Sequence, residues 1–256
     1  MAGIVMFIKT EALVLRETEY KDHDKLLTLL TKEHGRLTVR ARGVKGKTSK
    51  IKAGCQLLCF SEFTLKDYQG FYYVSEAESI QMFPELRDNL ELLSLASYFA
   101  QAAEVVSQED VPNPELLSLL LNSMYALSKL KLPQTLVKAA FELRLACISG
   151  YEPYLARCPI CGKEKPDRFN VTKGVIHCSG CHDVELSEGI RLPVSEGTLA
   201  AMRYIVSASA KKVFSFTLSD AGVQELSGLT ETFLVSQLEH GFYTLDFYKS
   251  LVNTYV

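Results

Sequence analysis

The chain has 256 residues, of which 47 % are hydrophobic, so it can bury the core of one large domain or two smaller ones. Its formal net charge of −2 argues against a nonspecific polycation, and its apolar runs fall far short of the ~20 residues that cross a bilayer. The amino terminus, "MAGIVMFIKTEALVLRE", has neither a charged segment ahead of its apolar run nor a small-residue cleavage site. We therefore expect a cytoplasmic protein.

Charge is distributed unevenly along the chain. Residues 1–82 carry 13 Lys and Arg against 10 Asp and Glu, whereas residues 83–256 carry 15 against 20. The two parts therefore have net charges of about +3 and −5, which sum to the −2 of the whole chain. This asymmetry indicates a polyanion-binding part joined to a part of a different kind.

Up to Met82 the sequence has the pattern of a β-barrel. Short β-rich runs alternate in polarity and are punctuated by Gly, as in "KLLTLLT", "RLTVRARGV" and "CQLLCF". In "EFTLKDYQGFYYVSEAE" two such runs flank Gln69–Gly70, which suits a tight hairpin turn. We expect residues 1–82 to form a small antiparallel β-barrel.

From Pro84 onward the apolar period is helical. We expect residues 83–256 to form a helical bundle with a cysteine-rich insertion at 156–184, so the chain as a whole is a multidomain α+β protein. The expected helices start at Pro84, at Pro114 behind an Asn113 cap, at about Pro133 with a stop at Gly150, at 195, and at 219 with an end at Gly241.

The insertion contains four cysteines in two pairs. Each pair has the C-x2-C spacing, and sixteen residues separate the pairs, which is typical of a four-thiolate zinc site. Because four thiolates complete the tetrahedron, no position stays open for water or substrate, and we expect one structural Zn²⁺. The predicted ligands are Cys158, Cys161, Cys178 and Cys181.

Two histidines, His177 and His182, flank the second cysteine pair. Either can replace a ligand or donate to a sulfur. The simpler expectation is that both are exposed neighbours in a small ribbon, because the four thiolates already complete the coordination.

A basic segment, "RLTVRARGVKGKTSKIK", combines a strand with a glycine-containing loop. A period of two puts Leu37, Val39 and Ala41 on the core face, with cationic residues on the opposite face. Seven cationic side chains fall within seventeen residues, with no acidic residue among them. This density favours a phosphate backbone over the alternative, a solvated barrel edge. The predicted DNA-binding residues are Arg36, Arg40, Arg42, Lys45, Lys47, Lys50 and Lys52.

Aromatic residues near the hairpin are candidates to stack on bases. Because alternate residues of a strand face the core, only some of them are expected to be free. The candidates are Tyr68, Phe71, Tyr72 and Tyr73.

The stretch "ARGVKGKT", residues 41–48, fits a loose phosphate-loop pattern. A phosphate loop needs a helix directly after it, whereas here only "SKIKA" precedes Gly54 and a strand is expected next. No other catalytic motif is evident, so we expect a protein that is not an enzyme.

Three stretches, taken in order, resemble the RecO family of bacterial recombination mediators: "VLRETEYKDHDKLLTLLTKEHGRLTVRARGVKGKTSKIKAG", "AAFELRLACISGYEP" and "CPICG…CSGC". The resemblance runs over essentially the whole chain. It implies an amino-terminal OB-fold barrel, a carboxy-terminal helical domain and a zinc-binding insertion.

The resemblance also implies a function in DNA repair without catalysis. The family binds single- and double-stranded DNA, anneals complementary strands, and acts with RecR to load RecA onto DNA coated by single-stranded DNA-binding protein. Such a protein is cytoplasmic and associated with the nucleoid.

The alternative is a DNA-binding regulator that contacts DNA mainly through its zinc ribbon. Acidic residues at 164, 167 and 183 dilute the ribbon's positive charge and weaken this alternative. The ribbon cations on which it rests are Lys163, Lys165, Arg168 and Lys173.

Overall fold

The computed structural model describes residues 6–182, 184, 186 and 188–253; Asp183 and the residues ahead of Met6 lie outside this range. The chain forms two compact units. The first consists of Met1–Met124 and Phe242–Val256, and the second of Tyr125–Gly241. No helix in the described part of the chain is long and apolar enough to span a membrane.

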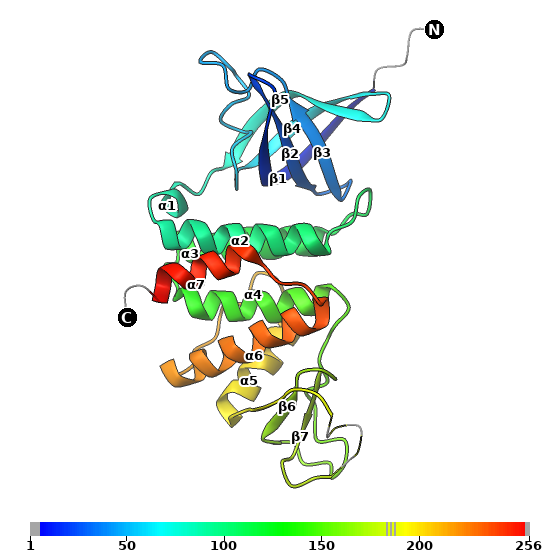
Figure 1. The fold of residues 1–256 in the computed structure, drawn as a ribbon, viewed down its shortest axis with the longest axis vertical. Coiled ribbons are helices and arrows are strands. Elements are labelled where there is room, and N and C mark those ends of the chain that lie inside the picture. The colour runs from blue at the N-terminus through cyan, green and yellow to red at the C-terminus, as the bar shows by residue number, and fades with distance from the viewer. Residues whose placement is uncertain (1–5, 183, 185, 187, 254–256) are drawn as a thin grey trace. The chain divides into compact units, whose positions relative to one another are not determined.

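The first unit contains a closed five-stranded barrel, labelled β1 to β5 in Figure 1. Its strand order is β1-β2-β3-β5-β4, and every neighbouring pair is antiparallel except β3 and β5, which are parallel. This confirms the predicted amino-terminal barrel of the OB type. The strands are β1 (Met6–Tyr20), β2 (Asp24–Thr31), β3 (Arg36–Ala41), β4 (Phe60–Tyr68) and β5 (Phe71–Gln81).

The alternation predicted for the basic strand is present in β3. Leu37, Val39 and Ala41 are buried in the barrel core, while Arg36 and Arg40 on the other face are partly exposed. Because the side-chain period of a strand is two, packing three apolar side chains inward fixes the outward direction of the arginines.

The hairpin was predicted correctly, and the strand predicted from "CQLLCF" only at its end. Gln69 and Gly70 both have positive φ, 55° and 80°, as a two-residue turn between twisted strands requires. Residues 55–58 form turns, and β4 begins at Phe60. Leu58 donates its N–H to the carbonyl of Val14 at 2.9 Å. This hydrogen bond connects the turns to β1, although residues 55–58 are not a strand of the sheet.

The helix expected from Pro84 is divided. Asn89 is extended (φ −132°, ψ 120°), and its side chain accepts the N–H of Leu92, which caps a new helix. The predicted Asn113 cap is confirmed, since its Oδ1 accepts the N–H of Leu116 at 2.9 Å. The elements are α1 (Pro84–Arg87), α2 (Leu90–Val106), α3 (Pro114–Ser128), which continues into the second unit, and α7 (Tyr243–Asn253).

The second unit combines helices with a three-stranded sheet of order β7-β6-β8. The expected stop after the third predicted helix is confirmed by Gly150, whose φ is +90°. The expected end at Gly241 is wrong: that helix ends at Leu238, where Glu239 adopts a left-handed conformation (φ 49°). The elements are α4 (Gln134–Ile148), β6 (Arg168–Asn170), β7 (Val175–His177), β8 (Arg191–Pro193), α5 (Glu196–Ser207) and α6 (Asp220–Leu238).

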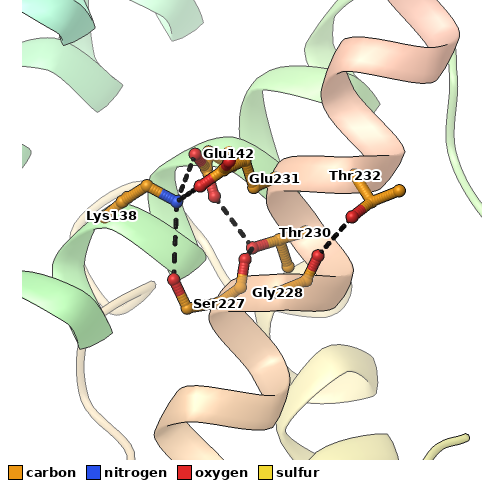
Figure 2. Close-up of polar contacts among 7 residues, drawn as sticks. All are labelled: Lys138, Glu142, Ser227, Gly228, Thr230, Glu231 and Thr232. Atoms are coloured by element: carbon orange, nitrogen blue, oxygen red, sulfur yellow. Dashed lines mark hydrogen bonds and ion pairs between the residues drawn. The ribbon is translucent and has the colours of Figure 1, made fainter. Parts of the chain in front are cut away.

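A buried charge cluster joins α4 to α6 (Figure 2). Lys138 Nζ lies 2.8 Å from Glu142 and 2.8 Å from Glu231, and the side chain of Glu142 is fully buried. Thr230 donates its hydroxyl to Glu142 at 2.9 Å. Burial disfavours the Lys138 charge, but the two carboxylates outweigh this cost and raise the pKa of Lys138. The cluster therefore fixes how the two helices meet.

We expect Lys138→Met to destabilise the protein by about 3–5 kcal/mol, because it leaves the Glu142 carboxylate buried without its cation. Lys138→Met combined with Glu142→Leu should recover most of the loss, since the fully buried carboxylate is removed together with its cation and Glu231, whose side chain is 24 % exposed, can be solvated. Urea and thermal unfolding followed by circular dichroism measure both effects; the chain has no Trp for fluorescence. Lys211→Met, at an exposed lysine, is the control.

The wild-type contribution of the Lys138 ion pair should be complete below the ordinary lysine pKa of 10.5 and be lost as the pH rises through the raised folded-state value. If Lys138→Met unfolded like the control at neutral pH, the cluster would have no role in stability.

Candidate nucleic-acid interface and metal centre

A groove of ≈ 670 Å³ opens on the barrel between β3 and the β4–β5 hairpin. It forms there because β3 and β5 pair only through Val39 with Tyr72 and Arg40 with Tyr73. The groove is lined by basic, aromatic and acidic side chains: Arg36, Arg40, Tyr20, Phe71, Tyr72, Tyr73, Glu109 and Asp110.

Arg40 is held inside the groove by Asp24. Its Nε and Nη2 donate to Asp24 Oδ2 at 2.7 and 2.5 Å, and its guanidinium lies 4.8 Å from the centre of the Tyr20 ring. Asp24 Oδ1 accepts the N–H of Gly43 at 2.8 Å. The Gly43 N–H and then Arg40 lower the pKa of Asp24, which keeps its carboxylate ionised. One carboxylate thus holds both the strand arginine and the start of the basic loop.

Two further predicted cations also have partners. Arg36 donates Nη1 to the carbonyl of Glu104 at 2.8 Å and lies 3.8 Å from the Glu109 carboxylate. Lys45 forms an ion pair with Glu19. Sequence reasoning missed these partners, because Glu19 and Asp24 precede the basic segment and Glu109 follows it by more than fifty residues.

The remaining predicted cations are exposed. Arg42 lies over the Tyr73 ring at 4.1 Å from its centre. Lys47, Lys50 and Lys52 lie in the loop after β3, and their side chains have no hydrogen-bond or ion-pair partner in the part of the chain that the structure describes. The seven predicted DNA-binding residues are therefore divided into three charges compensated by an ion pair with a carboxylate and four that form no ion pair within the described residues.

The aromatic candidates divide in the same way. Phe71, at the hairpin, is 69 % exposed and lines the groove, whereas Tyr72 packs against the barrel core. Tyr73 supports Arg42, and Tyr68 is 46 % exposed. Phe71 is thus the most accessible stacking surface at the groove.

The phosphate-loop pattern does not have phosphate-loop geometry. Residues 42–48 are turns that follow β3, and turns continue to Leu58 where a helix would be needed. Val44 and Cys55 are buried in the barrel core, so this loop is anchored to the core at two places.

The four predicted cysteines converge in the second unit. Their sulfur atoms all lie within 4.8 Å of one another, and Cys161 Sγ is 3.7 Å from Cys178 Sγ. The first turn is closed by the N–H of Gly162, which donates to the Cys158 carbonyl at 2.9 Å, and Gly162 has a φ of 75° that glycine tolerates. The cluster fits a metal ion held by four sulfurs.

The electrostatics of the thiols also fit a cation. Burial works against a Cys158 thiolate, but amide hydrogen bonds from Cys161 and Cys178 outweigh it and lower the pKa of Cys158 to about 6. Burial and the neighbouring sulfurs raise the pKa of Cys178 to about 12. Four thiolates so close together repel one another, so a positive ion is needed to hold all four in the charged form.

The flanking histidines differ from each other. His182 is exposed, as expected, but the expectation that His177 is exposed is wrong, since it is only 3 % exposed in β7. Its Nδ1 lies 3.2 Å from the carbonyl of Cys178. The cysteine cluster in the described part of the chain includes neither histidine.

The cluster closes a ribbon whose sheet packs on α6. Phe169 of β6 meets Phe233 edge-on with ring centres 5.3 Å apart. Gln237 Nε2 donates to the carbonyl of Val171 at 2.9 Å. The third strand of this sheet, β8, follows the predicted insertion at 156–184.

A closed five-stranded barrel with an aromatic and basic groove, combined with helices and a four-cysteine cluster, defines a protein of the oligonucleotide-binding-fold class. Two family descriptions match the chain: "Recombination protein O N terminal" over residues 6–83 and "Recombination protein O C terminal" over residues 87–246.

Several relatives are similar over nearly their whole length. The DNA repair protein RecO of Acetivibrio thermocellus is 33 % identical over 247 residues, covering 96 % of this chain and 97 % of the relative. RecO of Alkaliphilus metalliredigens is 28 % identical over 249 residues, covering 96 % and 100 %, and RecO of Dehalococcoides mccartyi is 30 % identical over 221 residues, covering 85 % of each. The chain belongs to the RecO family of DNA repair and recombination proteins.

The family consists of recombination mediators that are not enzymes, so the protein is not an enzyme. The turns that follow Thr48 agree with this, because a phosphate loop needs a helix at that point.

We expect Cys158→Ser and Cys161→Ser each to abolish binding of one metal ion per chain and to destabilise the second unit. The reason is that a structural metal site contributes its binding free energy to folding. Elemental analysis of the purified protein and thermal unfolding measure the two losses. Cys147→Ala, outside the cluster, should keep the metal. Full metal content in the two serine variants would contradict a four-thiolate site.

Proposed function

We propose that the protein is a recombination mediator that binds single- and double-stranded DNA, anneals complementary strands, and acts with RecR to load RecA onto DNA coated by single-stranded DNA-binding protein. Membership of the RecO family supports this proposal. A protein with this task works on the chromosome, in the cytoplasm and in association with the nucleoid.

The observation that carries the proposal is a set of four exposed cations that form no ion pair within the described residues and that follow the strand β3 lining the groove. Arg42, Lys47, Lys50 and Lys52 project from the end of β3 and the loop that follows it. OB-type barrels bind oligonucleotides on the face that includes β3 and the β1–β2 and β4–β5 loops. Lysines on flexible stems neutralise phosphates without reading bases, which suits binding to any sequence.

The compensated arginines have a different role in this proposal. Arg36 and Arg40 are oriented by Glu109 and Asp24, so a phosphate gains less charge neutralisation there than at the free lysines. They shape the groove in which Phe71 offers a ring to unstacked bases. A strand held by its phosphates has its repulsion toward a complementary strand reduced and its bases free to pair.

We propose Zn²⁺ as the metal, held by the thiolates of Cys158, Cys161, Cys178 and Cys181. Zinc accepts four sulfur ligands in a tetrahedron, and no ligand position is left for a reacting molecule. When bound, the ion stabilises the ribbon. The barrel segment 1–82 is proposed as the DNA-binding domain and residues 83–256, which carry the net negative charge, as the part that contacts protein partners.

We expect the combined variant Lys47→Gln, Lys50→Gln and Lys52→Gln to weaken DNA binding alike for unrelated sequences. The slope of the logarithm of the association constant against the logarithm of salt concentration should fall by about 2–3, because each neutralised phosphate contributes ~0.7–0.9. Fluorescence anisotropy with labelled oligonucleotides over a salt series measures this. The control, Lys9→Gln with Lys32→Gln, removes lysines paired with Glu62 and Glu11 and should change little. A loss confined to one base sequence would contradict phosphate binding.

We expect the wild-type protein to accelerate annealing of two complementary oligonucleotides, one labelled, without ATP and on strands coated with single-stranded DNA-binding protein. The acceleration should fall as salt rises, because it depends on phosphate neutralisation. Annealing that proceeds no faster than in buffer, despite measurable DNA binding, would count against annealing as the activity.

A further inference from the structure

The ribbon of the second unit contains a pocket of ≈ 400 Å³ that is separate from the barrel groove. It is lined by Arg168, His177, Ser179 and Arg191. All four residues belong to the ribbon sheet or the turn that follows it.

Strand register explains why these side chains meet. Arg168 of β6 is paired with His177 of β7, and Arg191 of β8 is paired with Asn170, two residues along β6. A period of two puts residues 168 and 170 on one face, so Arg168, His177 and Arg191 share that face. Phe169 points to the other face, where it meets Phe233. Packing of one face against α6 therefore leaves the charged face to form the pocket.

Three groups of the pocket, the two guanidinium groups and one histidine nitrogen, lack hydrogen-bond and ion-pair partners within the described residues. Neither Arg168 nor Arg191 has an ion pair or a side-chain hydrogen bond within the described residues. His177 is 3 % exposed, and its Nε2 is buried without a hydrogen-bond partner among those residues. A buried polar nitrogen without a partner costs free energy, and one that lines a pocket can be satisfied by a ligand.

The carboxylate of Asp167 is hydrogen-bonded to a residue of the pocket lining. Asp167 Oδ1 accepts the N–H of Ser179 at 2.8 Å, which lowers the pKa of Asp167, and its charge also acts on Arg168. The lining itself contains two guanidinium groups and no carboxylate. The described part of the site therefore favours an anion.

We propose that this pocket binds a phosphate group of DNA. Guanidinium groups from two strands line the pocket and together offer several N–H donors, which suits a tetrahedral anion with several acceptor oxygens. The identification of DNA as the source of the phosphate rests on the proposed function, and the source assigned is an internal phosphodiester. The pocket is a DNA-binding site in the second unit, whereas the basic loop belongs to the first unit.

From the sequence, DNA contact by the ribbon is considered only as the main contact of a regulator, whereas here it is a second contact in addition to the barrel and involves a different set of residues. Of the ribbon cations in the zinc-ribbon alternative, only Arg168 lines the pocket, and it is joined by Arg191, which lies after the predicted insertion. Two separate DNA-binding sites suit a protein that brings two strands together.

The test uses the full-length protein with Arg168→Gln and Arg191→Gln combined. We expect the salt slope of DNA binding to fall by about 1, as for one lost phosphate, with roughly tenfold weaker binding at 0.1 M salt. Lys211→Gln with Lys212→Gln removes the same charge from exposed positions of the same unit and should leave the slope unchanged. Arg168→Lys with Arg191→Lys should keep most of the slope but bind more weakly, because the guanidinium fork is lost.

Metal content and thermal unfolding show whether a variant is folded. If the double variant loses its metal, Arg191→Gln alone, at an exposed residue, replaces it and should show a smaller fall in slope. An unchanged slope in a folded variant would overturn the proposal.

Further arms identify the source of the phosphate. Oligonucleotides with and without a 5′-phosphate should bind equally if an internal phosphodiester is the ligand; a preference that Arg168→Gln with Arg191→Gln removes would reassign the pocket to strand ends. Inorganic phosphate at millimolar concentration is then compared with chloride at the same ionic strength. If phosphate competes with DNA more strongly than chloride does, the pocket would be reassigned to free phosphate.

The failure of this proposal is distinguishable from that of the proposed function. If the lysine variant of the basic loop reduces the slope and the ribbon variant does not, the proposed function stands and the pocket does not bind DNA. If the wild-type protein does not bind DNA at all, both fail.

Discussion

The short parallel pairing between β3 and β5 is the constraint on which the nucleic-acid interface depends. It closes the barrel with two residue pairs, Val39 with Tyr72 and Arg40 with Tyr73, and leaves a groove beside them. A longer pairing would fill the groove with backbone, and no pairing would leave an open edge. The same register places Arg40 opposite Tyr73, so the pairing that closes the barrel also brings basic and aromatic residues together at the groove.

Around this groove the structure assigns different roles to chemically similar residues. Asp24 binds Arg40 and the Gly43 N–H, so it connects the groove to the loop that carries the free lysines. Charges near a carboxylate are partly neutralised before any ligand arrives, whereas the loop lysines keep their full attraction for phosphate. The basic segment therefore looks uniform in the sequence but not in the structure. Carboxylates orient some of its cations, and the other cations are free to attract phosphate.

In the second unit, a buried ion-pair cluster and a partly exposed cysteine cluster have structural roles. The Lys138 cluster fixes α4 against α6 (Figure 2), and α6 in turn supports the ribbon through Phe233. The cysteines hold the turns at the far side of that ribbon. With one sheet face packed on α6, the other face can present arginines, which is the physical basis for a second phosphate site.

The sequence by itself determined the features that depend on local spacing. The barrel alternation in β3, the Gln69–Gly70 turn, the Asn113 cap and the cysteine quartet all follow from residue types at short separations, and the structure agrees with each. Local errors arose at Asn89, Glu239 and residues 55–58, where a cap, a left-handed residue and a tie to β1 overrode the apolar pattern.

Only the tertiary structure decided which charges are available. Asp24 and Glu109 are distant in sequence from the arginines they meet, and Arg191 reaches Arg168 only through the pairing of β6 with β8. The burial of His177 likewise depends on its place in the ribbon sheet. Whether a charge is compensated depends on which groups lie near it in space. The sequence alone shows this only for residues that a local turn brings together.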